Sequence, residues 1–515
     1  MLNSYAMPYP KLISRRRFAA ASLAGLAAYG PARLRALTPR PNLFIFIFVE
    51  QFRQVYLERN SRLLATGGFR KLMENGIYYP NCRLGASSFT ASGLATLATG
   101  AYPQIHGIVA DRWFDRKTHA AVNARADLLE ATTLADEMAR TGHGRIFCLG
   151  MQEAQASLLA GRSRAQTYWM DASGQFTTRG NVPEWLNAQN RVSPVENLRN
   201  GKWLALGAGS GVPPLRTLTY DVRRPEEFFA LYQSSPYAQD AQFEFLRALL
   251  TAEKLGQGDT LDFVFLSLGS MALLGYETGS DSPLMDQMVL QLDRQIQITL
   301  EALGKAPWKN RYNLILAAAH GAPPEPDPAT RSVKAISGES LARALNRALS
   351  EWFDKGAAKN AYVDKYVYPF LYLKLDALRK QSIGPRAARK LAGEAALRVP
   401  GLAGYYTADG DCSHTGEWRR RFENSFHELR SGDVMLSYEP ETVEDFGAGR
   451  GVSYGSLYNY DTRVPLFLYG PQFGKQAIER TIEAVDLAPT IARAAGMSPP
   501  SSAVGEVLAD AFAEA

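Results

Sequence analysis

Five stretches of the chain are apolar at nearly every position. They are Asn42–Gln51, Arg145–Gly150, Leu261–Ser270, Asn313–Gly321 and Val464–Gly470. A strand with one face in water alternates apolar and polar residues, whereas a strand covered on both faces is apolar throughout. The five runs therefore predict central strands of a mostly parallel sheet with a layer of structure on each face.

Segments of helical composition separate these runs, for example Gly67–Gly76, Ser282–Gly304 and Ala484–Gly496. Strands that alternate with helices predict an α/β fold with a doubly wound, mostly parallel sheet. In such folds the chemistry lies beyond the carboxyl ends of the strands. Glu50 and His320 come directly after two of the apolar runs, so both are candidate functional residues.

Two regions lack the alternation of strands and helices. Residues 171–259 are rich in Asn, Arg, Pro and aromatic residues, and residues 323–431 begin with a proline-rich stretch. We interpret both as insertions that cap the sheet of one large domain, which spans residues 41–515.

The N-terminal segment resembles an export signal. Ser14–Gly30 places paired arginines and Phe18 before a short, alanine-rich apolar stretch, as in twin-arginine signals. The stretch is too short and too weakly apolar for a membrane span, and an ordinary N-terminal helix is the alternative. We expect a signal peptide over residues 1–36, a periplasmic or otherwise exported protein, and no stable membrane span after its removal. Cys82, Cys148 and Cys412 would permit one disulfide bond there.

Composition narrows the class of protein. The 515 residues include 46% hydrophobic and 21% charged residues, which is typical of a globular protein. The formal net charge of +6 is small for this length, and no run of five basic residues occurs. Binding to nucleic acid is therefore not expected.

The stretch Ser87–Asp115 carries the densest local signal. Small and hydroxyl-bearing residues open a helix rich in Ala, Gly and Thr, and Thr90 lies near its start. A threonine there can cap the helix, or it can act as a nucleophile because the helix dipole favours negative charge. The residue types alone leave both roles open.

Several separate motifs give the chain a family resemblance. They are Val49–Asn60 (VEQFRQVYLERN), Gly67–Cys82 (GGFRKLMENGIYYPNC), Tyr458–Gly470 (YNYDTRVPLFLYG) and Ala484–Pro500 (AVDLAPTIARAAGMSPP). With the Thr90 segment, they resemble the alkaline phosphatase superfamily. Within it, the chain is most similar to the bacterial alkaline phosphatases with a threonine nucleophile, near the type I phosphodiesterase/nucleotide pyrophosphatases. The resemblance implies an α/β hydrolase that cleaves phosphate esters with two zinc ions.

The same resemblance implies that the expected active site is incomplete. Thr90 stands at the nucleophile position, and the first metal site retains Glu50, Thr90 and His320 but has Ala319 in place of an aspartate. At the second metal site, all three ligands are replaced, by Ala272, Tyr276 and Tyr454. The residues that bind the phosphate are also replaced: an asparagine by Asp111, a lysine by Gln152 and an arginine by Ala154. Zinc needs three or four N, O or S ligands, so at most one zinc site is expected, or none.

Three functions fit these observations. The first is an exported family member that is catalytically impaired, or a pseudoenzyme that acts in binding or scaffolding. The second is a hydrolase of phosphomonoesters, phosphodiesters or sulfate esters with a single metal held by Glu50, Thr90, Asp111 and His320. The third is an envelope- or carbohydrate-binding protein, suggested by aromatic residues in Ala165–Asp171 and Val182–Asn187 and around Tyr405.

Two of these residues have a plainer alternative. His320 can be a loop histidine bonded to the backbone, and Asp111 can be a surface turn residue. If the protein is active, its partner is a small phosphate ester or a related ester.

Overall fold

The computed structural model describes residues 41–209, 211–324, 334–355, 360–440, 442–445 and 454–513. The predicted signal peptide lies outside the described residues. One compact unit spans Pro41–Ala515. Among the described residues, no helix combines the length and the apolar character that a bilayer crossing requires.

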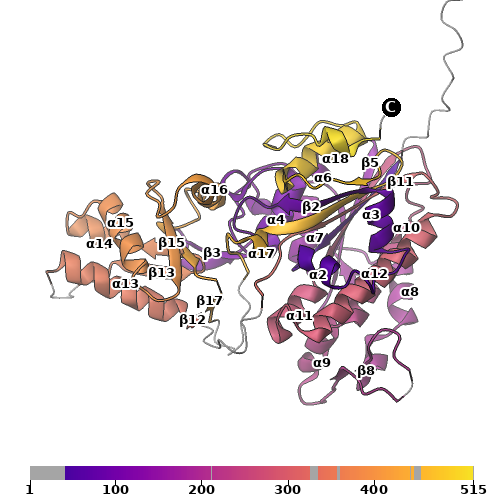
Figure 1. Ribbon diagram of the computed structural model, residues 1–515, viewed down its shortest axis with the longest axis horizontal. Helices are drawn as coiled ribbons and strands as arrows, with labels where there is room; N and C mark the ends of the chain where they lie inside the picture. Colours follow the sequence, from indigo (N-terminus) through magenta and orange to yellow (C-terminus); the bar gives the residue numbers. More distant parts are fainter. Residues whose placement is uncertain are drawn as a thin grey trace, which may run out of the picture. The chain divides into compact units, whose positions relative to one another are not determined.

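The largest sheet has ten strands within the described residues (Figure 1). Its order is β19 (Gln476–Ala477), β2 (Ile77–Arg83), β18 (Arg463–Tyr469), β11 (Tyr312–Ala318), β1 (Leu43–Val49), β10 (Leu261–Leu268), β5 (Gly144–Gly150), β6 (Gln166–Met170) and β7 (Phe176–Thr178), with β20 (Ile482–Glu483) paired to β2. Strands β11, β1, β10, β5 and β6 are parallel to one another, while β18 and β7 are antiparallel to their neighbours. The predicted central strands and the mostly parallel α/β sheet are confirmed.

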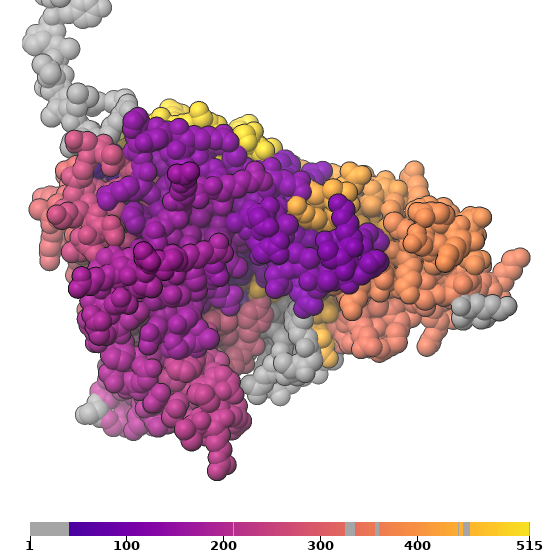
Figure 2. Space-filling view, turned by 180° about the vertical axis from the view of Figure 1, so that it is seen from behind, coloured from indigo at the N-terminus to yellow at the C-terminus, as the bar shows by residue number. Residues whose placement is uncertain are grey.

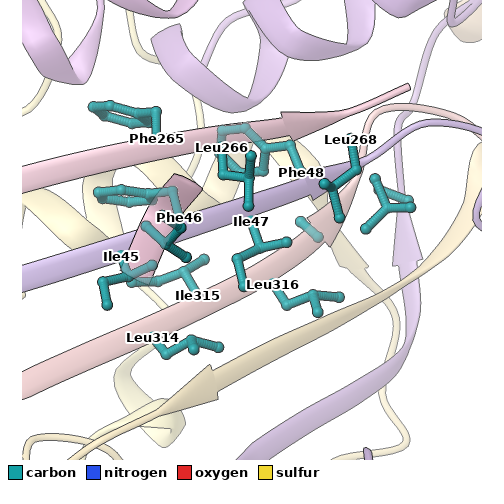
Figure 3. Close-up of a cluster of buried hydrophobic side chains, with 14 of the residues drawn as sticks. Ile45, Phe46, Ile47, Phe48, Phe265, Leu266, Leu268, Leu314, Ile315 and Leu316 are labelled. Atoms are coloured by element: carbon teal, nitrogen blue, oxygen red, sulfur yellow. The ribbon is translucent and has the colours of Figure 1, made fainter. Parts of the chain in front are cut away.

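Strand β1 is the centre of the hydrophobic core. Every residue from Leu43 to Val49 is fully buried. Figure 3 shows side chains of β1, β10 and β11 that pack across neighbouring strands, and the rings of Phe46 and Phe265 stack with their centroids 4.3 Å apart. A strand buried on both faces needs an apolar residue at each position, which explains the unbroken run in the sequence.

Helices cover both faces of this sheet (Figure 1). They include α2 (Gln54–Arg59), α3 (Phe69–Asn75), α4 (Thr90–Thr99), α5 (Pro103–His106), α6 (Leu134–Arg140), α7 (Glu153–Ala160), α10 (Pro236–Ala252), α11 (Ser270–Thr278), α12 (Pro283–Leu303), α17 (Asn459–Thr462) and α18 (Leu487–Ala495). The longest, α12, begins where the sequence predicts, because the Ser282 side chain accepts a hydrogen bond from the Met285 backbone and Pro283 occupies the first turn.

A glycine brings helix α4 close to the central strands. A β-carbon at Gly93 would overlap the backbone carbonyl oxygen of Ala319, which directly follows β11. Only glycine lets the two backbones approach this closely. The contact places the start of α4, and therefore Thr90, at the carboxyl ends of β1 and β11.

A smaller antiparallel sheet, which we call the cap, follows β11 in the chain. Its described strands are β13 (Val363–Val367), β14 (Phe370–Leu373), β16 (Val434–Tyr438) and β15 (Leu402–Thr407), in that order. Its helices are α13 (Gly338–Phe353), α14 (Leu375–Lys380), α15 (Pro385–Ala396) and α16 (Gly416–Ser425), and β12 (Lys334–Ile336) pairs with β17 (Thr442–Glu444) beside them. The cap has a hydrophobic core of its own, and a third apolar cluster joins it to α4 and to strand β3 (Arg112–Asp115).

The other predicted insertion, residues 171–259, has mixed structure. It contributes β7 at one edge of the main sheet and α10, which packs on α12, as well as α8 (Glu184–Val192), α9 (Pro225–Gln233) and the hairpin of β8 (Gly201–Trp203) and β9 (Arg216–Leu218). Tyr168 and Trp185, which suggested a carbohydrate-binding face, instead pack around Phe245. Core packing therefore explains these aromatic residues. The boundaries of both insertions stay a prediction.

The three cysteines are unpaired. Cys82 and Cys148 are buried in β2 and β5, and Cys412 is partly exposed. The disulfide bond that the composition would permit is not formed in this structure.

Candidate active site

Glu50 and His320 lie together because their strands are neighbours. Glu50 directly follows β1, and His320 comes two residues after the end of β11, which pairs with β1 in parallel. The Ala319 backbone N–H donates to the Val49 carbonyl oxygen at 3.0 Å, which holds the two strand ends in register. The predicted location of both residues at the carboxyl edge of the sheet is confirmed.

Thr90 connects these two side chains. Its hydroxyl oxygen lies 2.9 Å from Oε2 of Glu50 and 3.2 Å from Nε2 of His320. The start of α4 is capped by a different residue, because the Ser92 hydroxyl accepts a hydrogen bond from the Phe89 backbone. The interpretation of Thr90 as a plain helix cap is therefore wrong: its hydroxyl faces the site.

Glu50 is a buried carboxyl group that forms no ion pair with any described residue. It is 4% exposed, and Oε1 accepts hydrogen bonds from the Gln155 amide at 2.6 Å and the Ser267 hydroxyl at 3.4 Å. Burial raises its pKa from 4.5 to about 8, so the group is mostly protonated at neutral pH. A protonated Oε2 can donate to Thr90, which then donates to His320.

His320 is fully buried and neutral. Its Nδ1 lies 2.8 Å from the Gly321 carbonyl oxygen, which can only accept, so Nδ1 carries the proton and Nε2 is left as an acceptor toward Thr90. Burial lowers the pKa of the imidazole to about 4. The ring stacks on Tyr454 with centroids 4.1 Å apart. His320 is thus bonded to the backbone, as expected of a loop histidine, and also faces the candidate nucleophile.

The side chain of Asp111 is hydrogen-bonded to the N-terminus of helix α4. Its Oδ1 accepts a hydrogen bond from the Ala91 backbone N–H at 2.7 Å, and its Oδ2 accepts one from the Tyr454 hydroxyl at 2.9 Å. Burial raises the pKa of the carboxyl group. Asp111 is therefore not an exposed turn residue: its carboxylate takes the position at a helix N-terminus that favours an anion.

A cavity of about 360 Å³ contains almost all of the predicted site positions. Among the residues that line it are Glu50, Thr90, Asp111, Gln152, Ala154, Ala272, Tyr276 and Tyr454. Ala319 and His320 lie behind them, buried at the end of β11. The structure therefore brings together positions that are scattered over 400 residues of sequence.

Comparison with known families identifies this arrangement. A family model described as type I phosphodiesterase / nucleotide pyrophosphatase matches residues 44–443. The chain belongs to this family.

Related proteins align with this chain over most of their length. Alkaline phosphatase PafA of Elizabethkingia meningoseptica is 23% identical over 92% of this chain and 94% of its own. Alkaline phosphatase PhoV of Synechococcus elongatus is 24% identical over 92% of this chain and 93% of its own. The crystal structure of wild-type alkaline phosphatase PafA superposes with a TM-score of 0.81 at 20% identity, over 92% of this chain and 99% of that one. The structure of murine ectonucleotide pyrophosphatase / phosphodiesterase 5 superposes with a TM-score of 0.53 at 16% identity, over 88% of this chain and 95% of that one. The resemblance inferred from the motifs is confirmed.

The side chains of this family member do not fit a pair of zinc ions. Among the described residues, no three His, Cys, Asp or Glu side chains are grouped so that they could hold a metal ion. Ala272 and Ala319 offer no donor atom, and burial raises the pKa of the Tyr276 and Tyr454 hydroxyls, which keeps them neutral. Only Glu50, Thr90 and His320 converge, and Thr90 is a neutral hydroxyl.

Two residues of the site were not predicted from the sequence. Gln155 and Ser267 hold Oε1 of Glu50. Gln155 lies in the first turn of α7, after the end of β5, and Ser267 lies near the end of β10. Their location at strand ends is the signal that could have identified them.

Proposed function

We propose that this chain is an exported member of the phosphodiesterase family whose phosphohydrolase centre has become a non-hydrolytic site, and that it acts by binding. The observation that carries the proposal is the pair formed by Tyr454 and Asp111. By family resemblance Tyr454 replaces a metal-binding histidine, and Asp111 replaces a phosphate-binding asparagine. The two replacements bond to each other instead of to a metal and a substrate.

The electrostatics of the cavity support this proposal. Among the described residues, its lining includes the carboxyl groups of Glu50 and Asp111 but neither lysine nor arginine. Gln152 and Ala154 are exposed at the positions where a lysine and an arginine would hold the phosphate. A phosphate dianion there would meet the Asp111 carboxylate without a compensating cation, which disfavours its binding.

Hydrolysis assays test the proposal. The wild-type protein, Thr90→Ala and Thr90→Ser are incubated with 4-nitrophenyl phosphate, bis(4-nitrophenyl) phosphate and 4-nitrophenyl sulfate, with and without added zinc. We expect the rate of 4-nitrophenol release with each of the three proteins to equal the rate in buffer without protein. Release by the wild type and Thr90→Ser that Thr90→Ala abolishes would overturn the proposal.

A second candidate is a hydrolase with one metal ion. The convergence of Glu50, Thr90 and His320 favours it, because these three groups already contact one another. Asp111 would have to leave the Ala91 N–H and Tyr454 to join them. This candidate requires zinc-dependent hydrolysis that His320→Ala removes, and a His320→Ala variant with full activity would exclude it.

Export is the second part of the proposal and rests on the twin-arginine pattern at Arg15 and Arg16. We expect a reporter fused to the first 40 residues to be exported by the twin-arginine route and to stay in the cytoplasm when both arginines are changed to lysine. Export of the lysine variant at the wild-type level would contradict this assignment. The partner we propose is a small molecule and not a nucleic acid.

A further inference from the structure

A second cavity, of about 500 Å³, lies beside the candidate active site. Ligand pockets for small molecules commonly have about 300–1,000 Å³. Five aromatic side chains from different parts of the chain line it: Phe89, Tyr276, Tyr366, Tyr368 and Tyr454. We call it the aromatic cavity. Tyr276, Tyr454 and Asp111 line both cavities, so the two share one wall.

The aromatic walls are fixed by contacts with one another. Phe89 packs edge-on against Tyr368 and Tyr454, each with centroids 5.9 Å apart, and Tyr276 lies 5.3 Å from Tyr454. The Tyr366 hydroxyl is 2.8 Å from that of Tyr438 in the cap. Rings held in this way need little reordering when a ligand enters, which lowers the entropic cost of binding.

Two cations stand at the aromatic cavity. Arg112 belongs to β3 and Lys365 to β13, and these two strands are in contact. Figure 2 shows the cap, in orange, against the purple part of the main domain. Both side chains are exposed. Within the described part of the chain, neither has an ion-pair partner. They are therefore available to an anionic group of a ligand.

The carboxyl groups in the same walls are already engaged. Asp111 accepts hydrogen bonds from the Ala91 N–H and from Tyr454. Glu444 accepts one from the Tyr438 hydroxyl. These hydrogen bonds stabilise the two carboxyl groups, and Arg112 and Lys365 are the cationic side chains of the lining that can attract an anion.

We propose that the aromatic cavity binds a planar aromatic compound that carries an anionic group, with the ring against the tyrosines and the anion at Arg112 and Lys365. This inference rests on the proposed function, since it names the ligand class of a family member that binds without hydrolysis. Tyr276 and Tyr454, which stand at metal-ligand positions of the family, form one wall of the aromatic cavity. Aromatic rings stack on one another, and exposed cations add a modest attraction for an anion.

Isothermal titration with matched naphthalene probes tests this proposal. The probes are 2-naphthoate, neutral 2-naphthol, the cation (2-naphthylmethyl)trimethylammonium and inorganic phosphate. We expect 2-naphthoate to bind most tightly, 2-naphthol more weakly, and phosphate not at all. Tighter binding of the cation than of 2-naphthoate would overturn the proposal, because it would mean that the carboxyl groups set the charge preference.

Variants locate the binding. Arg112→Gln and Lys365→Gln should each weaken 2-naphthoate binding about threefold, and together about tenfold, without changing 2-naphthol binding. Lys117→Gln, an exposed lysine between β3 and β4 that does not line the cavity, is the matched control and should have no effect. Tyr368→Leu should weaken the binding of 2-naphthoate and of 2-naphthol about tenfold each. Wild-type affinity in the Arg112/Lys365 double variant would overturn the proposal.

The outcomes separate this inference from the proposed function. Zinc-dependent hydrolysis would contradict the proposed function whether or not 2-naphthoate binds. A protein that neither hydrolyses esters nor binds 2-naphthoate would contradict the inference alone.

Discussion

Replacing Glu50 with glutamine should stabilise the protein at neutral pH. The Glu50 carboxyl group has a pKa of 4.5 when exposed and about 8 in the folded chain, because burial disfavours the carboxylate. The contribution of Glu50 to stability is therefore largest below pH 4.5 and falls as the pH rises toward 8, since the folded chain keeps a proton that the unfolded chain releases. Between pH 4.5 and 7 this amounts to about 3 kcal/mol, at about 1.4 kcal/mol per pH unit.

Glutamine removes this cost and preserves the contacts. Its amide oxygen can accept from Gln155 and Ser267, and its amide N–H can donate to the Thr90 hydroxyl oxygen. We therefore expect Glu50→Gln to raise the free energy of unfolding by up to about 3 kcal/mol at pH 7 and to change it little at pH 4.5.

Urea denaturation at pH 4.5, 6, 7 and 8 measures this effect, with EDTA or with zinc. Glu74→Gln, at an exposed glutamate on α3, is the matched control and should change the free energy of unfolding by less than about 0.5 kcal/mol. A Glu50→Gln variant that is less stable than the wild type at pH 7, with a deficit that grows when zinc is added, would refute this reasoning. That result would mean that Glu50 is an ionised metal ligand.

Three further predictions concern stability. Tyr454→Phe removes a donor to the Asp111 carboxylate and should lower the free energy of unfolding by about 2 kcal/mol in urea denaturation; no loss would mean that this hydrogen bond is not formed. Asp240 on α10 has its pKa raised by burial from 3.8 to about 6, so its contribution to stability should fall as the pH rises through this range. Asp240→Asn should make the fall in stability less steep there and stabilise the protein by about 2 kcal/mol at pH 7; a slope equal to that of the wild type would contradict it. Gly93→Ala should lower the melting temperature strongly, because its methyl group would overlap the Ala319 carbonyl oxygen, and a neutral or stabilising effect, as in an ordinary helix, would contradict this close approach.

The sequence predicts the core of the fold well because burial on both faces leaves an unmistakable pattern. Strands β1, β10 and β11 have no polar face, and each prediction agrees with the observed strand to within a few residues. The antiparallel sheet of the cap was not predicted, because its strands are short and are separated in the chain by helices and loops. Their pairing is decided by contacts between distant segments.

The site was predicted in its positions but not in its bonding. The strand ends and the family motifs predict that Glu50, Thr90 and His320 lie in one site, and the structure places them in contact. The bond from Tyr454 to Asp111 joins residues 343 positions apart, so no local pattern predicts it. The residue types left a cap and a nucleophile both open for Thr90, and its contacts with Glu50 and His320 are likewise made between segments that are distant in the chain.

The metal content of the purified protein decides whether the hydrolytic centre survives. The mature chain and His320→Ala are equilibrated with micromolar zinc, separated from free metal, and measured by inductively coupled plasma mass spectrometry. We expect well under one zinc per chain, with no difference between the two proteins. One or more zinc ions per chain in the wild type that His320→Ala loses would contradict the proposal that this family member no longer holds a metal at its active site.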